Sequence, residues 1–324
     1  MKDEIEEERL ITKDFIARTW KKIQREMHNS VIGMDRTIES LFIAILTEGH
    51  ILLEGPPGIA KTLAAQNFAK VIGLDFKRIQ MTPDLLPADL IGTTIYNPKT
   101  NTFQFKEGPI FSNVILIDEI NRAPPKTQAA LLEVMEEKNV TVEGRSREVP
   151  RPFLVLATQN PVEMEGTFPL PEAQISRFLL HDVVDYPDSA EERKILELRK
   201  KTMDRVISHQ ITSGRTIFEM QKFIQNEVRV NDDVLDYIRD LVIKIREDGR
   251  LAFGCSPRAS IALLAASRVY AAMQGRDWVR PDDVKYIALP ALRHRLALEP
   301  EIELSGTSPK EIVLSSLKST PTPK

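Results

Sequence analysis

The fold of this chain is decided by Gly55-Pro56-Pro57-Gly58-Ile59-Ala60-Lys61-Thr62. This stretch follows a short apolar run, His50–Glu54, and precedes residues 61–71, whose composition predicts a helix. A glycine-rich turn between a strand and a helix is typical of a phosphate-binding loop, because glycines let backbone N–H groups approach phosphate oxygens and the helix N-terminus adds partial positive charge. Ala60 stands where the strict pattern has glycine, and we expect it to fit because its backbone is already helical. An ordinary glycine-proline turn entering a helix is the alternative.

A second motif strengthens the first. Residues 114–117 (Val-Ile-Leu-Ile) have the length and apolar character of a central parallel strand, and they end in Asp118 and Glu119. We expect residues 55–62 and Leu63 to bind a nucleotide, with Lys61 at the β- and γ-phosphates and with Thr62 and Asp118 holding Mg²⁺. Glu119 would polarise the attacking water as general base. The two motifs together predict an ATP site that uses Mg²⁺.

Composition limits the other classes of function. The chain has 324 residues, of which 42% are hydrophobic and 28% charged, as in an ordinary globular protein. Its net charge of −3 carries no basic signature of nucleic-acid binding. The N-terminus is acidic and lacks a signal-peptide core, and no apolar stretch approaches the ~20 residues of a membrane helix. A single cysteine, Cys255, excludes an internal disulfide framework. We therefore expect a cytoplasmic protein without a membrane span.

The pattern along the chain changes near residue 187. Before it, strand and helix signals alternate, which predicts an α/β fold with a parallel sheet and flanking helices. After it we find helix signals and no trusted strand. The expected organisation is an N-terminal helix (1–29), an α/β core with hairpins near residues 94–105 and 139–150 (30–187), an all-helical domain (188–304) and a flexible tail (305–324).

Several contiguous motifs resemble the MoxR family of AAA+ ATPases. The resemblance runs from about Val31 to about Leu298 and rests on residues 54–62, Gly108–Phe111, Asp118–Gln128, Leu156–Pro161 and Leu170–Gln174. It implies a P-loop AAA+ core followed by a helical lid.

The resemblance also implies roles for residues outside the two motifs. Asn160 matches sensor 1, which would orient the water or contact the γ-phosphate, although it could instead cap a turn. Arg177 matches the arginine finger offered to a neighbouring subunit, although Ser176 replaces the usual aspartate before it and a surface ion pair is the alternative. Arg258 matches sensor 2 on the lid and could act in cis or in trans. The loop packed near adenine corresponds to Val31, Ile32 and Gly33.

The family resemblance implies a working assembly as well. It indicates a ring of identical subunits, expected to be hexameric, that remodels a client protein and cooperates with a protein carrying a von Willebrand factor A domain. The two hairpins match inserts that face the ring's pore, although they could be plain edge hairpins. A magnesium-chelatase-like motor, a DNA-associated AAA+ motor and a nucleotide-gated scaffold are the competing functions. Nucleic acid is the less expected partner because of the −3 charge.

Overall fold

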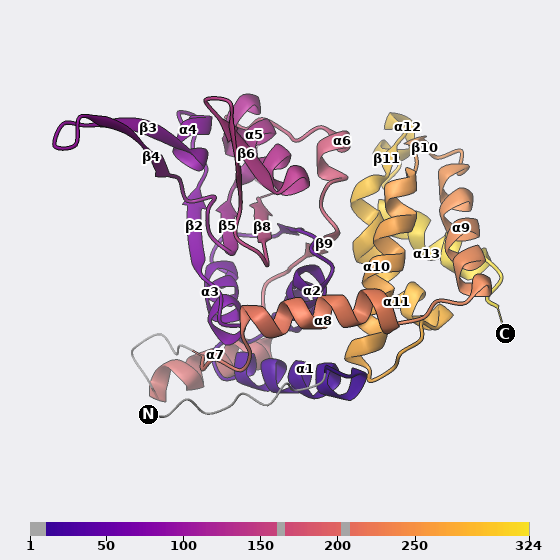
Figure 1. The fold of residues 1–324 in the computed structure, drawn as a ribbon. Helices are drawn as coiled ribbons and strands as arrows, with labels where there is room; N and C mark the ends of the chain where they lie inside the picture. The colour runs from indigo at the N-terminus through magenta and orange to yellow at the C-terminus, as the bar shows by residue number, and fades with distance from the viewer. Residues whose placement is uncertain (1–10, 161–165, 202–207, 324) are drawn as a thin grey trace, which may run out of the picture.

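A computed structural model of the chain describes residues 11–160, 166–201 and 208–323. Four parts of the expectations above lie outside these ranges: residues 1–10 of the N-terminal segment, residues 161–165 of the core with Pro161 of one family motif, residues 202–207 of the helical domain and the terminal Lys324. Figure 1 shows an α/β half and a helical half side by side.

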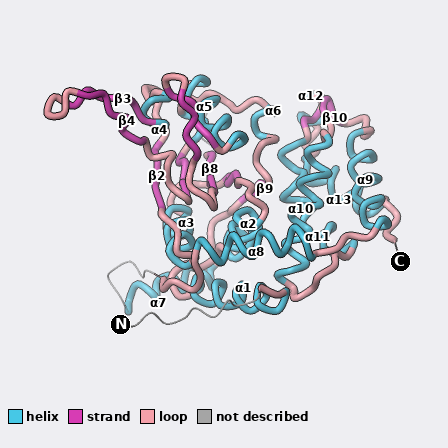
Figure 2. Tube along the Cα trace, viewed as in Figure 1, coloured by secondary structure: helices cyan, strands magenta, loops and turns pink. Residues whose placement is uncertain are grey.

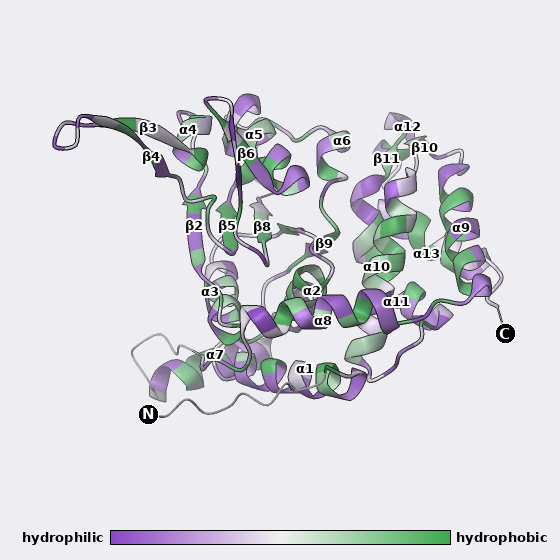
Figure 3. Cartoon of the chain, in the orientation of Figure 1, coloured by the Kyte–Doolittle hydropathy of each residue, from purple (hydrophilic) through white to green (hydrophobic). Residues whose placement is uncertain are grey.

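The α/β half is built on a parallel sheet of five strands in the order β2-β5-β8-β1-β9. The central strands β5 and β8 are apolar and buried because helices cover both faces of the sheet (Figure 3). The strands are β1 (Ile51–Glu54), β2 (Phe76–Gln80), β5 (Val114–Asp118), β8 (Leu154–Gln159) and β9 (Leu180–Val183). The helices of this half are α1 (Lys13–His28), α2 (Asp35–Leu46), α3 (Lys61–Val71), α4 (Pro87–Ile91), η1 (Ile120–Arg122), α5 (Pro125–Glu137) and α6 (Glu172–Ile175).

Both expected hairpins are confirmed. In the first, β3 (Gly92–Asn97) pairs antiparallel with β4 (Thr102–Glu107), and this hairpin projects away from the body of the molecule (Figure 1). The second pairs β6 (Asn139–Val142) with β7 (Arg145–Glu148), and Gly144 takes a positive φ of 76° in the turn.

The second half is helical, as expected, but the expectation that it holds no strand is wrong. Residues Leu251–Phe253 (β10) pair antiparallel with Ala297–Leu298 (β11), and Figure 2 shows this ribbon among the helices. Strands of three and two residues are too short to give an alternating pattern, so only the folded chain reveals them. The helices are α7 (Ser189–Lys201), α8 (Gly214–Glu227), α9 (Asp232–Arg246), α10 (Pro257–Met273), α11 (Pro281–Leu292), η2 (Arg293–Arg295) and α12 (Pro300–Leu304).

The C-terminal segment also corrects an expectation. The flexible tail predicted for residues 305–324 does not hold for Pro309–Ser319, which form helix α13. Ser308 caps this helix by accepting from the Glu311 N–H, and Ile312 and Val313 are buried against the rest of the lid. The Ser/Thr/Pro content of the segment suggested disorder, although Ser308 is a helix cap and is followed by the apolar residues Ile312 and Val313.

The two halves share one hydrophobic core. Ile16, Ile23 and Met27 of α1 belong to the same buried cluster as residues of α2, α10 and α11, and the Trp20 and Phe42 rings stack with centroids 5.2 Å apart. Gln221 of α8 donates from its buried amide to the Ile45 carbonyl at 2.7 Å. The helical half is therefore packed directly onto α1 and α2. No helix among the described residues has the length and apolar character needed to cross a membrane.

Candidate active site

The loop between β1 and α3 has the backbone that phosphate binding requires. Gly58 has a φ of 83°, and Ala60, at the N-cap of α3, has φ 64° and ψ 20°. The expectation that Ala60 is already helical is wrong, since it is left-handed, a conformation that costs a residue with a Cβ about 1–2 kcal/mol. This is why the strict pattern has glycine here. At Gly55 a Cβ would meet the Val184 carbonyl oxygen at 2.4 Å, so only glycine fits beside β9.

Lys61 lies at the start of α3 and turns back over the loop. Its Nζ donates to the Gly55 carbonyl at 2.8 Å. Burial lowers the pKa of Lys61, and the nearby carboxylates of Asp118 and Glu119 oppose that shift. The structure thus brings together the lysine of the loop and the two acids at the end of β5, which are 57 or more residues away in the chain.

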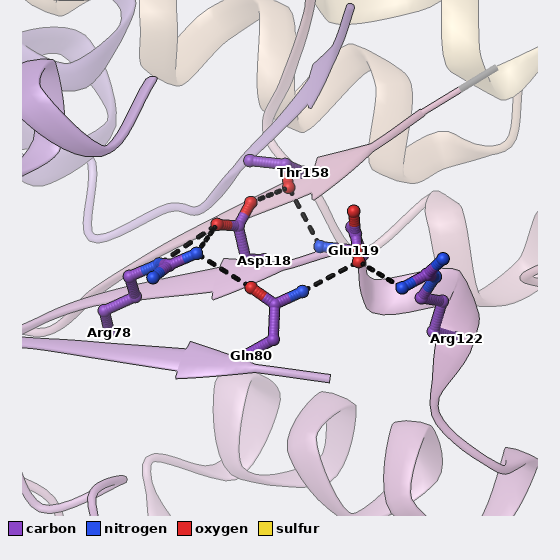
Figure 4. A network of polar contacts seen from close by, with 6 residues as sticks. All are labelled: Arg78, Gln80, Asp118, Glu119, Arg122 and Thr158. Carbon is purple, nitrogen blue, oxygen red and sulfur yellow. Dashed lines mark hydrogen bonds and ion pairs between the residues drawn. The ribbon is translucent and has the colours of Figure 1, made fainter. Parts of the chain in front are cut away.

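Asp118 is held from two neighbouring strands (Figure 4). Its Oδ2 accepts from Arg78 Nε at 3.1 Å and Nη2 at 2.8 Å, and its Oδ1 accepts from Thr158 Oγ1 at 2.7 Å. Arg78 comes from β2 and Thr158 from β8, which flank β5 in the sheet. The carboxylate is therefore fixed in orientation at the carboxyl edge of the sheet.

Glu119 has its own set of contacts. Its φ of 57° is left-handed, a strained conformation that clusters at functional sites. The Glu119 N–H donates to Thr158 Oγ1 at 3.0 Å, and its Oε2 accepts from Gln80 Nε2 at 2.7 Å and lies 3.1 Å from Arg122 Nη1. These contacts hold the Glu119 side chain so that it points away from the Asp118 side chain, as Figure 4 shows.

Sequence reasoning assigned no role to Arg78, Gln80 or Thr158. Gln80 is paired in register with Asp118 on the neighbouring strand. Knowledge of the strand order would have placed Gln80 at the site, but the order of strands in the sheet cannot be read from the sequence. Thr158 was named only as part of the family motif Leu156–Pro161, which also contains Asn160. That asparagine is buried and directly follows β8, at the same edge of the sheet as the two acids.

The donor set fits Mg²⁺ bound together with phosphate. Mg²⁺ prefers oxygen ligands and is usually held by one or two carboxylates plus substrate phosphates. Thr62 and Asp118 offer such oxygens. No group of three or more His, Cys, Asp or Glu side chains in the described ranges could hold a metal ion unaided.

The loop predicted to pack near adenine lines a pocket of about 410 Å³. Val31, Ile32 and Gly33 form one side of it, and Glu191, Lys194 and Leu198 of α7 are among the residues on the other. Residues of the phosphate loop do not belong to its lining, so this pocket does not contain the loop.

The remaining predicted residues, Arg177 and Arg258, meet at Glu136 on α5. Arg177 Nη1 lies 2.8 Å from Glu136 Oε2 and donates to the Leu132 carbonyl at 2.8 Å. Arg258 Nη2 binds the other oxygen of the same carboxylate. The structure therefore places a core arginine and a lid arginine at one position, with one acid between them.

Comparisons with known proteins identify the family of the chain. The model of the ATPase family associated with various cellular activities (AAA) matches residues 50–180, and an AAA lid domain model matches residues 243–315. Chaperone MoxR1 of Mycobacterium tuberculosis is 44% identical over 304 residues, covering 91% of this chain and 80% of that protein. The uncharacterized protein YeaC of Bacillus subtilis is 45% identical over 296 residues, covering 91% and 92%.

More distant and structural relatives extend the comparison. Protein MoxR of Methylorubrum extorquens is 32% identical over 307 residues, covering 87% of this chain and 89% of that protein. A crystal structure of a Cytophaga hutchinsonii protein, 42% identical, superposes with a TM-score of 0.90 over 96% of this chain and 97% of its own. Sequence, site geometry and fold agree, and the chain belongs to the MoxR family of AAA ATPases.

Proposed function

We propose that this protein hydrolyses ATP with Mg²⁺ at sites shared between neighbouring subunits of a ring. The observation that carries the proposal is the convergence of Lys61, Asp118 and Glu119 at the carboxyl edge of the sheet. Lys61 would bind the β- and γ-phosphates, Thr62 and Asp118 would hold Mg²⁺, and Glu119 would take the proton of the attacking water. Mg²⁺, when bound, neutralises charge on the phosphate oxygens. Asn160 would orient the water, and adenine would occupy the pocket lined by Val31–Gly33 and α7.

The arginine cluster supports catalysis between subunits. Arg177 and Arg258 share Glu136, so two positive charges face one negative charge and the group keeps a net attraction for phosphate. Arg258 binds the same Glu136 carboxylate that Arg177 contacts, which places it beside the proposed finger. We therefore assign both arginines to the nucleotide of the neighbouring subunit, which makes Arg258 a residue that acts in trans.

The work done by hydrolysis is proposed to be remodelling of a client protein, with a ring expected to be hexameric. Similarity to a relative named as a chaperone supports this, and the family resemblance suggests a partner with a von Willebrand factor A domain. The β3–β4 hairpin would reach such a client, since Phe103 and Tyr96 are exposed near its tip. A chelatase-like or DNA-associated motor is less favoured by the relatives found.

A mixing experiment tests shared sites. Arg177→Ala subunits keep an intact phosphate loop, and Lys61→Ala subunits keep an intact finger. We expect each to be inactive alone, because an arginine finger supplies roughly 10³–10⁵ in rate and the lysine binds the nucleotide. Mixed, they should recover activity at interfaces that pair a good loop with a good finger.

Two measurements make the mixing result decisive. Subunits carrying different tags are combined before assembly, and size-exclusion with tandem affinity purification isolates mixed rings. Steady-state ATPase is then measured on those rings. Mixed rings without activity would contradict the trans role of Arg177, and full activity of Arg177→Ala alone would move the finger to Arg122, Arg145 or Arg147.

A further inference from the structure

Arg295 of the lid donates hydrogen bonds to the backbone on both sides of the proposed finger, Arg177. Arg295 lies on η2 and is 9% exposed. Its Nη1 donates to the Ser176 carbonyl at 2.7 Å and its Nη2 donates to the Phe178 carbonyl at 2.7 Å. Its Nε donates to the Ala291 carbonyl at 2.8 Å, which anchors the guanidinium to the end of α11. The two carbonyls from the core belong to the residues on either side of Arg177.

Burial of the Arg295 guanidinium carries a desolvation cost. All three partners of the Arg295 guanidinium named above are backbone carbonyls, and none is a carboxylate. Burying a charge without an opposite charge costs free energy, and here burial lowers the pKa of Arg295 to about 10. The side chain therefore stays protonated at neutral pH and keeps all its donors.

The finger is held by the lid at two levels. Its backbone is fixed by Arg295 and by His294, whose Nε2 donates to the Phe178 carbonyl at 2.9 Å. Its side chain shares Glu136 with Arg258 of α10.

We propose that Arg295 is a positioning residue that holds the Arg177 backbone so that the finger reaches the phosphate of the neighbouring subunit. This inference rests on the proposed trans role of Arg177. Because Arg295 belongs to the lid, it also makes finger placement depend on the position of the lid. The role requires a guanidinium, since a planar fork with several N–H donors spans two carbonyls while a lysine ammonium is a single point charge.

The first test is Arg295→Lys, which keeps the charge and loses the fork. We expect kcat to fall about 10-fold to 100-fold, because a misplacement of about 1 Å costs as much. Binding of a fluorescent ATP analogue to the subunit's own phosphate loop should be unchanged. Arg268→Lys is the matched control. Arg268 also donates to two backbone carbonyls, that of Val228 at 2.9 Å and that of Gln225 at 3.2 Å. These carbonyls lie at the C-terminal end of α8 and are not part of the finger segment. Its kcat should equal that of the wild type.

Complementation separates a positioning role from a structural one. If Arg295 acts through Arg177, Arg295→Lys subunits are finger-defective. Their activity should return when they are mixed with Lys61→Ala subunits and should not return with Arg177→Ala subunits. Rescue by Arg177→Ala subunits instead would show that Arg295 serves its own phosphate site, and this would overturn the proposal.

A double variant gives a second test that does not depend on mixing subunits. In rings of Arg177→Ala the further change Arg295→Lys should not lower the residual kcat, because the group it positions is gone. An additional drop equal to that seen in the wild type would overturn the proposal. Failure of the proposed function is recognised separately. In that case the mixture of Arg177→Ala and Lys61→Ala subunits, in which Arg295 is unchanged, would recover no activity.

Discussion

At the residue scale, Glu119 combines strain with a defined set of contacts. Its left-handed φ of 57° and the hydrogen bond from its N–H to Thr158 aim the side chain away from that of Asp118. The carboxylate then rests on Gln80 and near Arg122. In the proposed mechanism, this separation lets Asp118 serve Mg²⁺ while Glu119 serves the attacking water.

We predict that Glu119→Gln binds ATP with unchanged affinity and hydrolyses it about 10²–10⁴-fold more slowly, as expected for loss of a general base. The change keeps the shape of the side chain and removes its basicity. Calorimetric titration and steady-state turnover measure the two effects. Glu133→Gln, an exposed position on α5, is the control and should match the wild type. Turnover of Glu119→Gln near the wild-type level would show that another residue activates the water.

At the element scale, helix α13 completes the packing of the lid at the C-terminal end of the chain. Its Ile312 and Val313 are fully buried, while Leu314, next along the chain, is 39% exposed. The helix packs beside α9 and α11, and Lys244 Nζ of α9 donates to the Ser319 carbonyl at 2.8 Å. The segment is therefore part of the folded lid.

We predict that Ile312→Ala lowers the free energy of unfolding by about 2–5 kcal/mol, the usual effect of truncating a buried aliphatic side chain. Leu314→Ala on the same helix should change it by no more than about 0.5 kcal/mol, as for most surface positions. Urea unfolding followed by circular dichroism compares the two. Equal small effects would mean that α13 is not packed in solution.

At the scale of the whole molecule, a buried histidine ties one layer to the next. His50 precedes β1, its Nδ1 accepts from the Val155 N–H of β8 at 3.0 Å, and its Nε2 donates to the Met135 carbonyl of α5 at 3.0 Å. The first contact requires an unprotonated Nδ1, so the two contacts together select the neutral ring with its proton on Nε2. Complete burial lowers the pKa of His50 to about 4.

This pKa predicts loss of stability in mild acid. The folded pKa lies below the unfolded value of about 6.5, so the stabilisation is complete above that pH and is lost as the pH falls toward 4, at up to about 1.4 kcal/mol per pH unit. Between pH 7 and pH 5 the loss from this group is about 2 kcal/mol. Urea unfolding of the wild type and of His50→Gln, which keeps a donor and an acceptor but does not titrate, should differ by that amount in pH dependence. Parallel pH profiles would contradict the assignment.

Local patterns in the sequence predicted the two motifs and many of the helices and strands. The phosphate loop, the strand ending in Asp118 and Glu119, both hairpins and helices α3, α9 and α10 follow from glycine placement, apolar runs and helix caps, which act over a few neighbouring residues. The same local reasoning missed α13, where a capping serine and two apolar residues stand in a polar segment, and misjudged Ala60, whose conformation depends on the loop around it.

Which side chains contact one another depends on how the distant elements pack. Arg78, Gln80 and Thr158 contact the two acids only because β2 and β8 flank β5, and Arg177, Arg258 and Arg295 come together only because the lid folds back onto α5 and α6. These partners are 39 to 122 residues apart in the chain. Side chains of an element follow from its own periodicity, but a contact across such separations depends on strand order and helix packing, which are set by burial of the whole core.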